Sequence, residues 1–402
     1  MNVLSLLKLP SRVAGFLAGI GLLGGVFSPS HAEAAYRQVP DSYQDADANV
    51  LRGGPVLLFS DSPEVVYEDG ILYKDTVEGE GRVFFHHVNG SKNYKKLAVL
   101  MRPLDGITTV TWGCRGIGDP DRSYYASAIK GQQRYFDEYK EYWEKARKHS
   151  LKTKKKTASG KRVAAKEAPD HSFYGSVPDL PLTTLSKGEY LEILSRQRNM
   201  GHAGTRLKPK QLLTGMFDFY AARPVEITIM MCDPGEDIDS FSRSAALLPM
   251  DEHPLRGTYR NADLTYIIKE PIQMKWFQSK ALCLAGSDDT EFLKGIDGIS
   301  GTQTENYGNY GVVYHIRYSV AGEKPVKLGI NPWGGDFYGA CLQISEDGAE
   351  VSRIPGKDKH FGAGDEIDDI FVVSPNHKRK DAEFIWSPPG ASNLPVRIFW
   401  SM

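Results

Sequence analysis

The chain has 402 residues, a formal net charge of −1, and charged side chains at 25% of its positions. A net charge so close to zero argues against nucleic acid as a partner and against attraction of the whole molecule to an acidic polymer. The length suffices for two ordinary domains. The 40 glycines and 23 prolines, spread between short strand-like segments, favour a mainly β fold over a helical one.

The first 34 residues have the pattern of a secretory signal peptide. Lys8 and Arg12 supply positive charge, an apolar run follows at 13–26, and small residues suited to cleavage lie near Ala32 and Ala34. The apolar run is short for a bilayer crossing, which needs roughly 20 residues. We therefore predict export to the cell envelope or the medium, with an uncleaved anchor as the alternative. No later segment predicts a transmembrane helix.

A polar arm is expected at 35–53, followed by a first β-sandwich domain at 54–260. Short strand-like segments at 56–60, 82–88, 95–101 and 108–112 recur at the spacing of a sandwich. Strand character returns at 190–194, 212–220 and 225–231, and the segment 253–259 resembles a hinge between domains.

One helix, at 132–148, interrupts this domain, because Tyr135, Tyr139 and Trp143 recur every four residues. We interpret this aromatic stripe as a docking surface rather than a ligand site. A flexible basic insertion is expected next, at 149–170, because 140–166 contains eleven Lys and Arg residues. This insertion is either a charged linker without a partner or a segment attracted to an anionic envelope polymer or lipid headgroups.

A second β-sandwich domain is expected at 261–402, organised around a strand at 308–320. Bulky residues such as Tyr310 and Tyr314 occupy every second position there, and Asn309, His315 and Arg317 occupy the positions between them. This alternation predicts a half-buried strand with a polar strip on its other face. Further strands are expected at 326–330, 338–344 and 394–400.

Three sets of segments together resemble a known group of proteins. They are 60–64 with 70–73 and 85–90, then 308–314, and finally 387–395. These segments resemble secreted bacterial proteins that often carry the label copper amine oxidase N-terminal-like domain. The resemblance spans most of the mature chain, although the small repeat behind that label is not evident in this sequence. It implies export, and it implies no activity.

Copper amine oxidase chemistry itself is disfavoured by the motifs. Copper amine oxidases themselves make a quinone from the Tyr of Asn-Tyr-Asp/Glu and hold copper with three His, two of them in His-x-His. In this sequence Tyr307 and Tyr310 are each followed by glycine, and no His-x-His occurs. His86 and His87 are adjacent, so on a regular strand they point to opposite faces. We keep these two histidines as weak metal candidates, with packed and hydrogen-bonded histidines as the alternative. We expect Tyr307 and Tyr310 to remain unmodified.

Calcium and disulfides are left open by the sequence. The acidic runs 233–239 and 365–369 lack EF-hand spacing, so they are either exposed loops or irregular calcium sites. The four cysteines either pair as Cys114–Cys232 and Cys283–Cys341 or remain buried free thiols. We expect no cofactor, with copper and calcium not excluded.

The functional prediction is an exported, non-catalytic module of the envelope or extracellular space that acts by binding or assembly. The alternative is a metal-dependent or glycan-directed enzyme whose residues converge only in the fold. A polar site for cell-wall glycan or peptide is expected on loops beside the strand at 308–320. Its candidate residues are Asp297, Asn306, Asn309, His315, Arg317 and Trp333. The ring of Trp333 either stacks on a sugar or packs inward.

Overall fold

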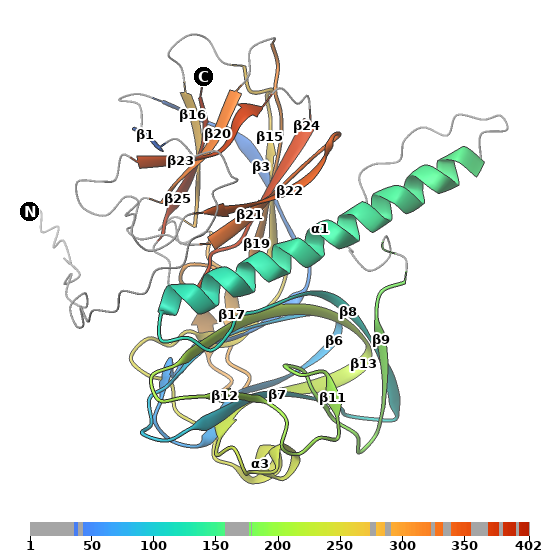
Figure 1. The fold of residues 1–402 in the computed structure, drawn as a ribbon, viewed down its shortest axis with the longest axis vertical. Coiled ribbons are helices and arrows are strands. Elements are labelled where there is room, and N and C mark those ends of the chain that lie inside the picture. Colours follow the sequence, from blue (N-terminus) through green and yellow to red (C-terminus); the bar gives the residue numbers. More distant parts are fainter. Residues whose placement is uncertain are drawn as a thin grey trace, which may run out of the picture. The chain divides into compact units, whose positions relative to one another are not determined.

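The computed structural model describes residues 36–38, 43–156, 177, 179–273, 279–285, 291–322, 326–332, 339–354, 369–377, 381–390 and 394–401. The predicted signal peptide, Trp333 and the acidic residues 365–368 lie outside these ranges. Within them the fold is mainly β, as predicted, and its strands form three mixed sheets (Figure 1). The segment Ala35–Met402 forms one compact unit, and its division near residue 260 stays a prediction.

The largest sheet has 13 strands in the described chain, and its path runs β11-β10-β7-β13-β6-β4-β14-β17-β18 with β5, β8, β9 and β12 attached. Its strands are β4 (Val56–Ser60), β5 (Val65–Val66), β6 (Gly70–Asn89), β7 (Lys95–Pro103), β8 (Ile107–Ile117), β9 (Leu182–Ser186), β10 (Leu191–Glu192), β11 (Gln197–Arg198), β12 (Thr205–Leu207), β13 (Leu212–Cys232), β14 (Arg256–Tyr259), β17 (Lys294–Ile296) and β18 (Gln303–Glu305).

Two long antiparallel strands, β6 and β13, form the centre of this sheet. They pair from Leu212 opposite Val88 to Met231 opposite Gly70, with a register shift after Ala221. The sequence predicted two separate strands over 212–231, whereas the structure continues the chain through this irregularity as one strand. Alternate positions of β6, β7 and β13 bury one large apolar cluster that includes Phe85, Val99, Met101, Phe217 and Phe219.

Two smaller sheets contain the remaining strands. One, here the β20 sheet, has the order β1 (Tyr36–Gln38), β23 (Asp369–His377), β20 (Val326–Pro332), β25 (Val396–Ser401), β16 (Ser279–Leu284) and β2 (Gln44–Asp45). The other, here the β19 sheet, has the order β22 (Gly348–Ile354), β21 (Gly339–Ser345), β24 (Asp381–Trp386), β19 (Val313–Ser319), β15 (Asp263–Ile268) and β3 (Ala48–Gly53). The rings of Tyr318 on β19 and Trp400 on β25 lie 5.3 Å apart, so the two sheets are in contact.

The strand predicted at 308–320 begins later than expected. β19 starts at Val313, because Gly308, Asn309 and Gly311 have φ angles of +96°, +50° and +79° and form turns instead. His315 is buried on this strand together with Tyr314, so both faces of β19 are covered. The polar strip that we expected on one face is therefore not an open surface.

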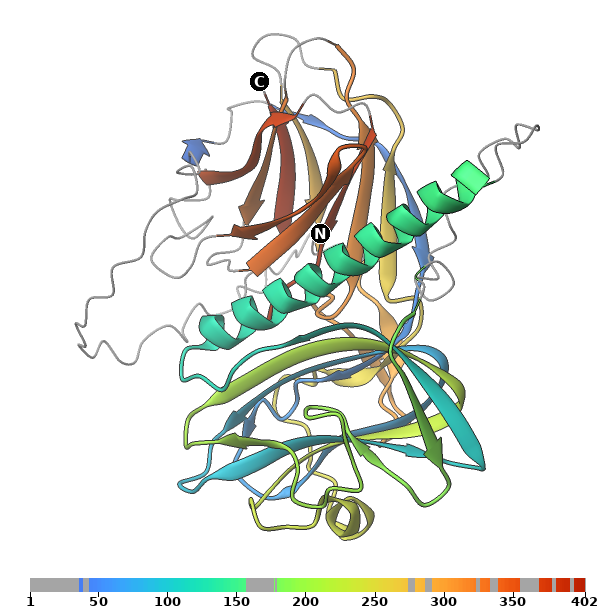
Figure 2. The same ribbon diagram turned by 45° about the vertical axis from the view of Figure 1, so that its right-hand side comes forward.

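The helix α1 (Tyr124–Lys156) is longer than predicted at both ends. No glycine or proline occurs between residues 132 and 156, so the sequence contains no helix breaker there. The helix therefore continues to Lys156, into the segment 149–170 that was predicted to be a flexible insertion. Residues 157–176 lie outside the described part. As predicted, the aromatic stripe docks: α1 packs between β8 and β13 on one side and β21 and β22 on the other (Figures 1 and 2). The second helix, α3 (Ile238–Ser244), is short.

Neither of these two helices of the described chain has the apolar length needed to cross a membrane. The cysteines are all free thiols: Cys114, Cys232 and Cys341 are buried, and Cys283 is exposed. Neither predicted disulfide is formed, and the alternative of buried thiols is correct except at Cys283.

A buried guanidinium connects the large sheet to α1 and to the β19 sheet. Arg82 on β6 donates to both carboxylate oxygens of Asp218 on β13, at 2.7 and 3.0 Å. It also donates to Asp263 on β15 at 2.8 Å and to the carbonyl of Gly311 at 3.2 Å. Tyr135 of α1 completes the network by donating to Asp218 at 2.8 Å. Residues before and after position 260 therefore share one buried ionic network.

Candidate binding cleft

An open cleft of about 1170 Å³ lies beside the hairpin of β17 and β18. The cleft is lined by residues 75–78 of β6, Thr258 of β14, the hairpin itself, and residues 297, 298, 301 and 302 of its connecting loop. The segment 253–259, predicted as a hinge, contains β14, which pairs with β4 on one side and β17 on the other. A rigid sheet therefore supports the cleft, where the sequence predicted a flexible joint.

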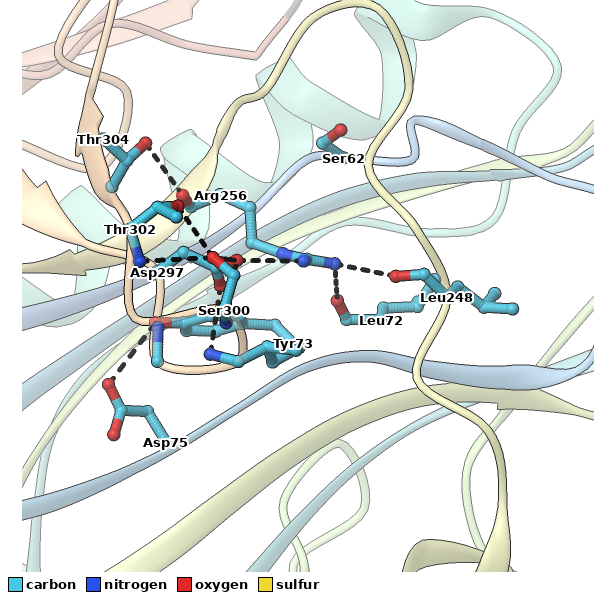
Figure 3. Close-up of polar contacts among 12 residues, drawn as sticks. Ser62, Leu72, Tyr73, Asp75, Leu248, Arg256, Asp297, Ser300, Thr302 and Thr304 are labelled. Carbon is cyan, nitrogen blue, oxygen red and sulfur yellow. Dashed lines mark hydrogen bonds and ion pairs between the residues drawn. The ribbon is translucent and has the colours of Figure 1, made fainter.

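A single carboxylate, that of Asp297, holds the loop 297–302. Its Oδ2 accepts hydrogen bonds from Arg256 at 3.1 Å and from the Ser300 hydroxyl at 2.7 Å, while its Oδ1 accepts one from the Ile299 amide at 3.2 Å (Figure 3). The amide of Asp297 donates to the carbonyl of Thr302 at 2.9 Å, which closes the loop. Burial would raise the pKa of Asp297, but the bonds from Arg256 and Ser300 outweigh it and hold that pKa below 3.8.

Arg256 connects this loop to two other segments. Its buried guanidinium donates to the carbonyl of Leu72 on β6 at 3.1 Å and to the carbonyl of Leu248 at 2.9 Å (Figure 3). Because the Arg256–Asp297 ion pair is almost completely buried, water screens it little. The loop is therefore held firmly against the sheet before any ligand arrives.

A second polar network joins the loop to β6. The hydroxyl of Tyr73 lies 2.7 Å from that of Thr258 and accepts the amide of Gly298 at 3.1 Å. Thr258 in turn donates to Asp75. A Cβ at Gly298 would lie 2.5 Å from Asp75 Oδ2, so a larger residue here would have to displace the Asp75 side chain. Burial raises the pKa of Tyr73 well above its ordinary value, which keeps its hydroxyl protonated.

The mouth of the cleft combines an aromatic ring with charged groups. Tyr307 is 57% exposed, and its ring lies 6.0 Å from that of Phe292 in an edge-on arrangement. The charged side chains that line the cleft away from the loop are Glu78, Arg260, Lys294 and Glu305. Within the described chain, none of these four takes part in an ion pair.

The polar groups of the cleft lining divide into those bonded within the protein and those left for a ligand. The described residues that form it include no histidine, cysteine or serine nucleophile. The carboxylates of Asp75 and Asp297 both accept hydrogen bonds from neighbouring protein groups. Hydroxyl, amide and charged groups remain for contact with a polar ligand.

The predicted site residues fall into two separate places. Asp297 belongs to the cleft, but it is buried and supports the loop instead of facing a ligand. His315 and Arg317 both bind Glu383 on β24, at 2.9 and 3.2 Å, and belong to the β19 sheet. Burial raises the pKa of Glu383, but His315 and Arg317 outweigh it and bring that pKa to about 2. Trp333 lies outside the described residues.

Asn306 and Asn309 support the turn that carries Tyr307. Asn306 accepts the amide of Tyr310 at 3.1 Å and donates to the carbonyl of the same residue at 2.9 Å. Asn309 accepts the amide of Leu293 at 2.9 Å and donates to the Tyr314 hydroxyl at 2.9 Å. Both amides are buried and satisfied, so they fix the backbone below the mouth of the cleft.

The two candidate metal ligands, His86 and His87, point to different partners, as their adjacent positions on a strand predict. His86 Nδ1 lies 2.8 Å from the Thr214 hydroxyl, and His87 Nε2 lies 2.9 Å from the Ser60 hydroxyl. Burial lowers the pKa of His86 to about 3 and that of His87 to about 4, so both rings are neutral. They are packed and hydrogen-bonded, which is the alternative that the sequence left open.

The aspartates of the acidic run 233–239 form ion pairs and a helix N-cap. Asp233 binds Lys95 at 2.5 Å, and Asp237 accepts the amide of Ser240 at the start of α3. Asp239 binds Arg102. Across the described ranges, no three His, Cys, Asp or Glu side chains are placed to hold a metal ion.

A second group of carboxyls lies away from the cleft, around the turn after β4. Asp251 accepts hydrogen bonds from the Ser62 hydroxyl and from the amide of Glu64, both at 2.8 Å. Asp61 lies beside them, and its Oδ1 is buried without a hydrogen-bond partner among the described residues. Burial and then its acidic neighbours raise the pKa of Asp61 well above 3.8, and burial also raises that of Glu64.

Comparison with known proteins gives no family for this chain. No family model matches it, and no curated protein matches it. A search of solved structures finds an oxalate decarboxylase–formate complex from Lactobacillus farciminis, at 8% identity over 93% of this chain and 87% of that one, with a TM-score of 0.16. It also finds a tryptophan-to-phenylalanine variant of Bacillus subtilis oxalate decarboxylase, at 10% identity over 87% and 77%, with a TM-score of 0.11. Scores this low carry no argument about fold or function.

The residues that sequence reasoning missed are Arg256, Tyr73 and Thr258. Arg256 meets Asp297 across 41 positions, and Tyr73 meets Thr258 across 185. The one local signal was the cluster of Asp, Ser, Thr and Gly at 297–302, which is typical of a tight, internally hydrogen-bonded loop.

Proposed function

We propose that this chain is an exported module of the envelope or extracellular space that binds a wall polymer in the cleft beside β18 without transforming it. Export and the family resemblance rest on the sequence alone. We also propose that the β19 and β20 sheets pack as a sandwich, with Tyr318 and Trp400 in its interior.

One observation carries the proposal: the cleft is open, polar and supported by a buried ion pair. A preorganised wall lowers the ordering cost of binding, and polar groups beside an exposed ring suit a sugar or a peptide. Asp75 and Asp297, two of the carboxylates in the lining, already accept hydrogen bonds from the protein, which supports binding over acid–base catalysis by these two groups.

The test is a titration of soluble cell-wall fragments against the full chain and two tyrosine variants. Tyr307→Ala removes the ring at the mouth, while Tyr94→Ala removes a ring that is 52% exposed and does not line the cleft. We expect Tyr307→Ala to weaken binding about tenfold or more and Tyr94→Ala to leave it unchanged. Equal affinity of the wild type and both folded variants would exclude the cleft as the binding site.

A second candidate, a glycan-directed enzyme, is favoured by the raised pKa values of Asp61 and Glu64, because a protonated carboxyl can act as a general acid. Mass spectrometry of wall fragments after incubation separates the two functions. Unchanged fragments support a binding module. Cleavage that is lost in both Asp61→Asn and Glu64→Gln would support the enzyme.

A further inference from the structure

Among the described residues, no strand pairs with the side of β18 that faces away from β17. The amide of Asn306 donates to the carbonyl of Leu293, and the amide of Asp297 donates to that of Thr302, both at 2.9 Å. Between these contacts, Gly295 lies opposite Thr304. In an antiparallel pair, hydrogen-bonded positions alternate with positions whose backbone groups point outward. The outward positions of β18 are therefore 303 and 305.

No other described strand covers these groups. β18 is the last strand in the order of the large sheet. The backbone of Gln303 and of Glu305 thus offers two N–H donors and two carbonyl acceptors along one edge. Such an edge is a template for a further strand. All three residues of β18 line the cleft, so space for an added strand lies beside it.

The charges of the cleft extend this argument to the ligand. In the register of β14 and β17, Thr258 lies opposite Ile296 and Tyr259 opposite Gly295, so the next position brings Arg260 beside Lys294. Lys294 itself lies opposite Glu305. Residues directly opposite one another share a face of the sheet. Arg260, Lys294 and Glu305 therefore form a row on the face that lines the cleft.

This row and Glu78 on β6 provide both signs of charge. Arg260, Lys294 and Glu78 are exposed, and none of the four groups forms an ion pair within the described chain. A neutral glycan has no charged group to pair with Arg260 or Glu78. A segment with both ammonium and carboxylate groups would pair with them, and peptides have this composition.

We infer that the ligand of the cleft is an extended peptide, which binds by adding a strand to the free edge of β18. This inference rests on the proposed binding function and names its ligand class. Main-chain hydrogen bonds to residues 303 and 305 supply the affinity, and Arg260, Lys294, Glu305 and Glu78 select peptides that carry both charges.

A proline scan tests the edge directly. Gln303→Pro removes an outward N–H while leaving the pairing with β17 intact, since proline is tolerated at edge positions whose N–H faces outward. Gln303→Ala keeps that N–H and removes only the side chain. The probe is a seven-residue peptide of threonine and valine with one lysine and one glutamate, compared with the same peptide N-methylated at alternate amides. The readouts are calorimetry and amide hydrogen exchange at residues 303 and 305.

We expect the peptide to bind the wild type and Gln303→Ala alike and to slow exchange at the 303 and 305 amides at least tenfold. Gln303→Pro and N-methylation should each weaken binding about tenfold or more, the equivalent of one lost hydrogen bond and its steric cost. Should Gln303→Pro not fold, the N-methylated peptide on the wild type decides the question alone.

Other outcomes separate the two proposals. Binding that is insensitive to both proline and N-methylation would overturn strand addition and leave the cleft as a binding site. If neutral wall oligosaccharides bind in a Tyr307-dependent way and the peptide does not, the peptide class is wrong and the proposed function stands. If neither ligand binds in the cleft, both proposals fail.

Discussion

Replacing Asp297 by asparagine should both destabilise the protein and loosen the wall of the cleft. The side chain keeps its size, so the change is electrostatic. In the wild type both oxygens of Asp297 accept hydrogen bonds, and one of these bonds comes from the buried guanidinium of Arg256. An asparagine offers one oxygen and one NH₂ group, and the NH₂ group would meet a donor in either orientation.

The expected cost is the sum of two losses. A hydrogen bond to a charged group contributes about 1.5–3 kcal/mol, and a buried donor without a partner costs about 1–3 kcal/mol. Together they come to about 2.5–6 kcal/mol, which brackets the roughly 3–5 kcal/mol found when one partner of a buried ion pair is removed. Ser300→Ala removes one hydrogen bond to the same carboxylate, but Ser300 is exposed and water can replace its hydroxyl, so the change should cost only about 1 kcal/mol.

Urea unfolding of the wild type, Asp297→Asn, Ser300→Ala, Arg256→Met and the double variant Asp297→Asn/Arg256→Met measures these differences. The double variant should lose less than the sum of the single variants, because the second change removes an already unpaired charge. Amide exchange at Gly301, whose N–H donates to the carbonyl of Asp297, should become faster in Asp297→Asn. A loss below about 1 kcal/mol with unchanged exchange would refute the view that this ion pair holds the loop.

Three further outcomes follow from buried charges elsewhere. Arg82→Met should cost about 3–5 kcal/mol in urea unfolding, whereas Arg134→Met, at an exposed ion pair, should cost less than about 1 kcal/mol; equal costs would contradict the network. The raised pKa of Asp61 means that its contribution to stability is present below 3.8 and lost as the pH rises through the folded value; Asp61→Asn should therefore flatten the decline in Tm toward neutral pH, and an unchanged profile would count against burial. Glu383, whose pKa is lowered to about 2 with the help of His315 despite its burial, stabilises above 4.5 and loses this effect as the pH falls toward 2; Glu383→Gln should remove that acid-limb loss, as measured by Tm against pH.

The strand content was predictable because period-two alternation is a local signal. It located β4, β7, β8 and parts of β6, β10 and β13 in the large sheet, and most of β19. It missed the short strands β5, β9, β11, β12, β14, β17 and β18, three of which line the cleft. It failed at 308–312, because alternation cannot distinguish an extended strand from turns that happen to place Tyr310 and Val312 inward. Asn309 has a positive φ angle, which asparagine tolerates better than most residues, and this preference indicates a turn.

The supports of the cleft were not predictable, since they depend on pairings that are distant in the sequence. Nothing near Asp297 indicates that Arg256 will lie beneath it, because that contact requires β14 and β17 to be neighbours in the sheet. The length of α1 was hidden for a different reason: its final turns are rich in lysines, which are good helix formers but also typical of flexible segments.

The polar loop residues that the sequence predicted as ligand-binding mostly hold the backbone of the cleft in place and do not face a ligand. Asp297, Asn306 and Asn309 are buried and satisfied, while Tyr307 and Gln303 are exposed to the cleft. Substitutions in the first group should lower stability and affinity together, because they loosen the wall and the turn. In the second group, Tyr307→Ala should lower affinity at constant stability, whereas Gln303→Ala keeps the backbone N–H and should change neither. A ligand that binds elsewhere on the molecule would be insensitive to both groups once folding is accounted for, so the pattern across the two groups identifies the binding site whatever the chemistry of the ligand.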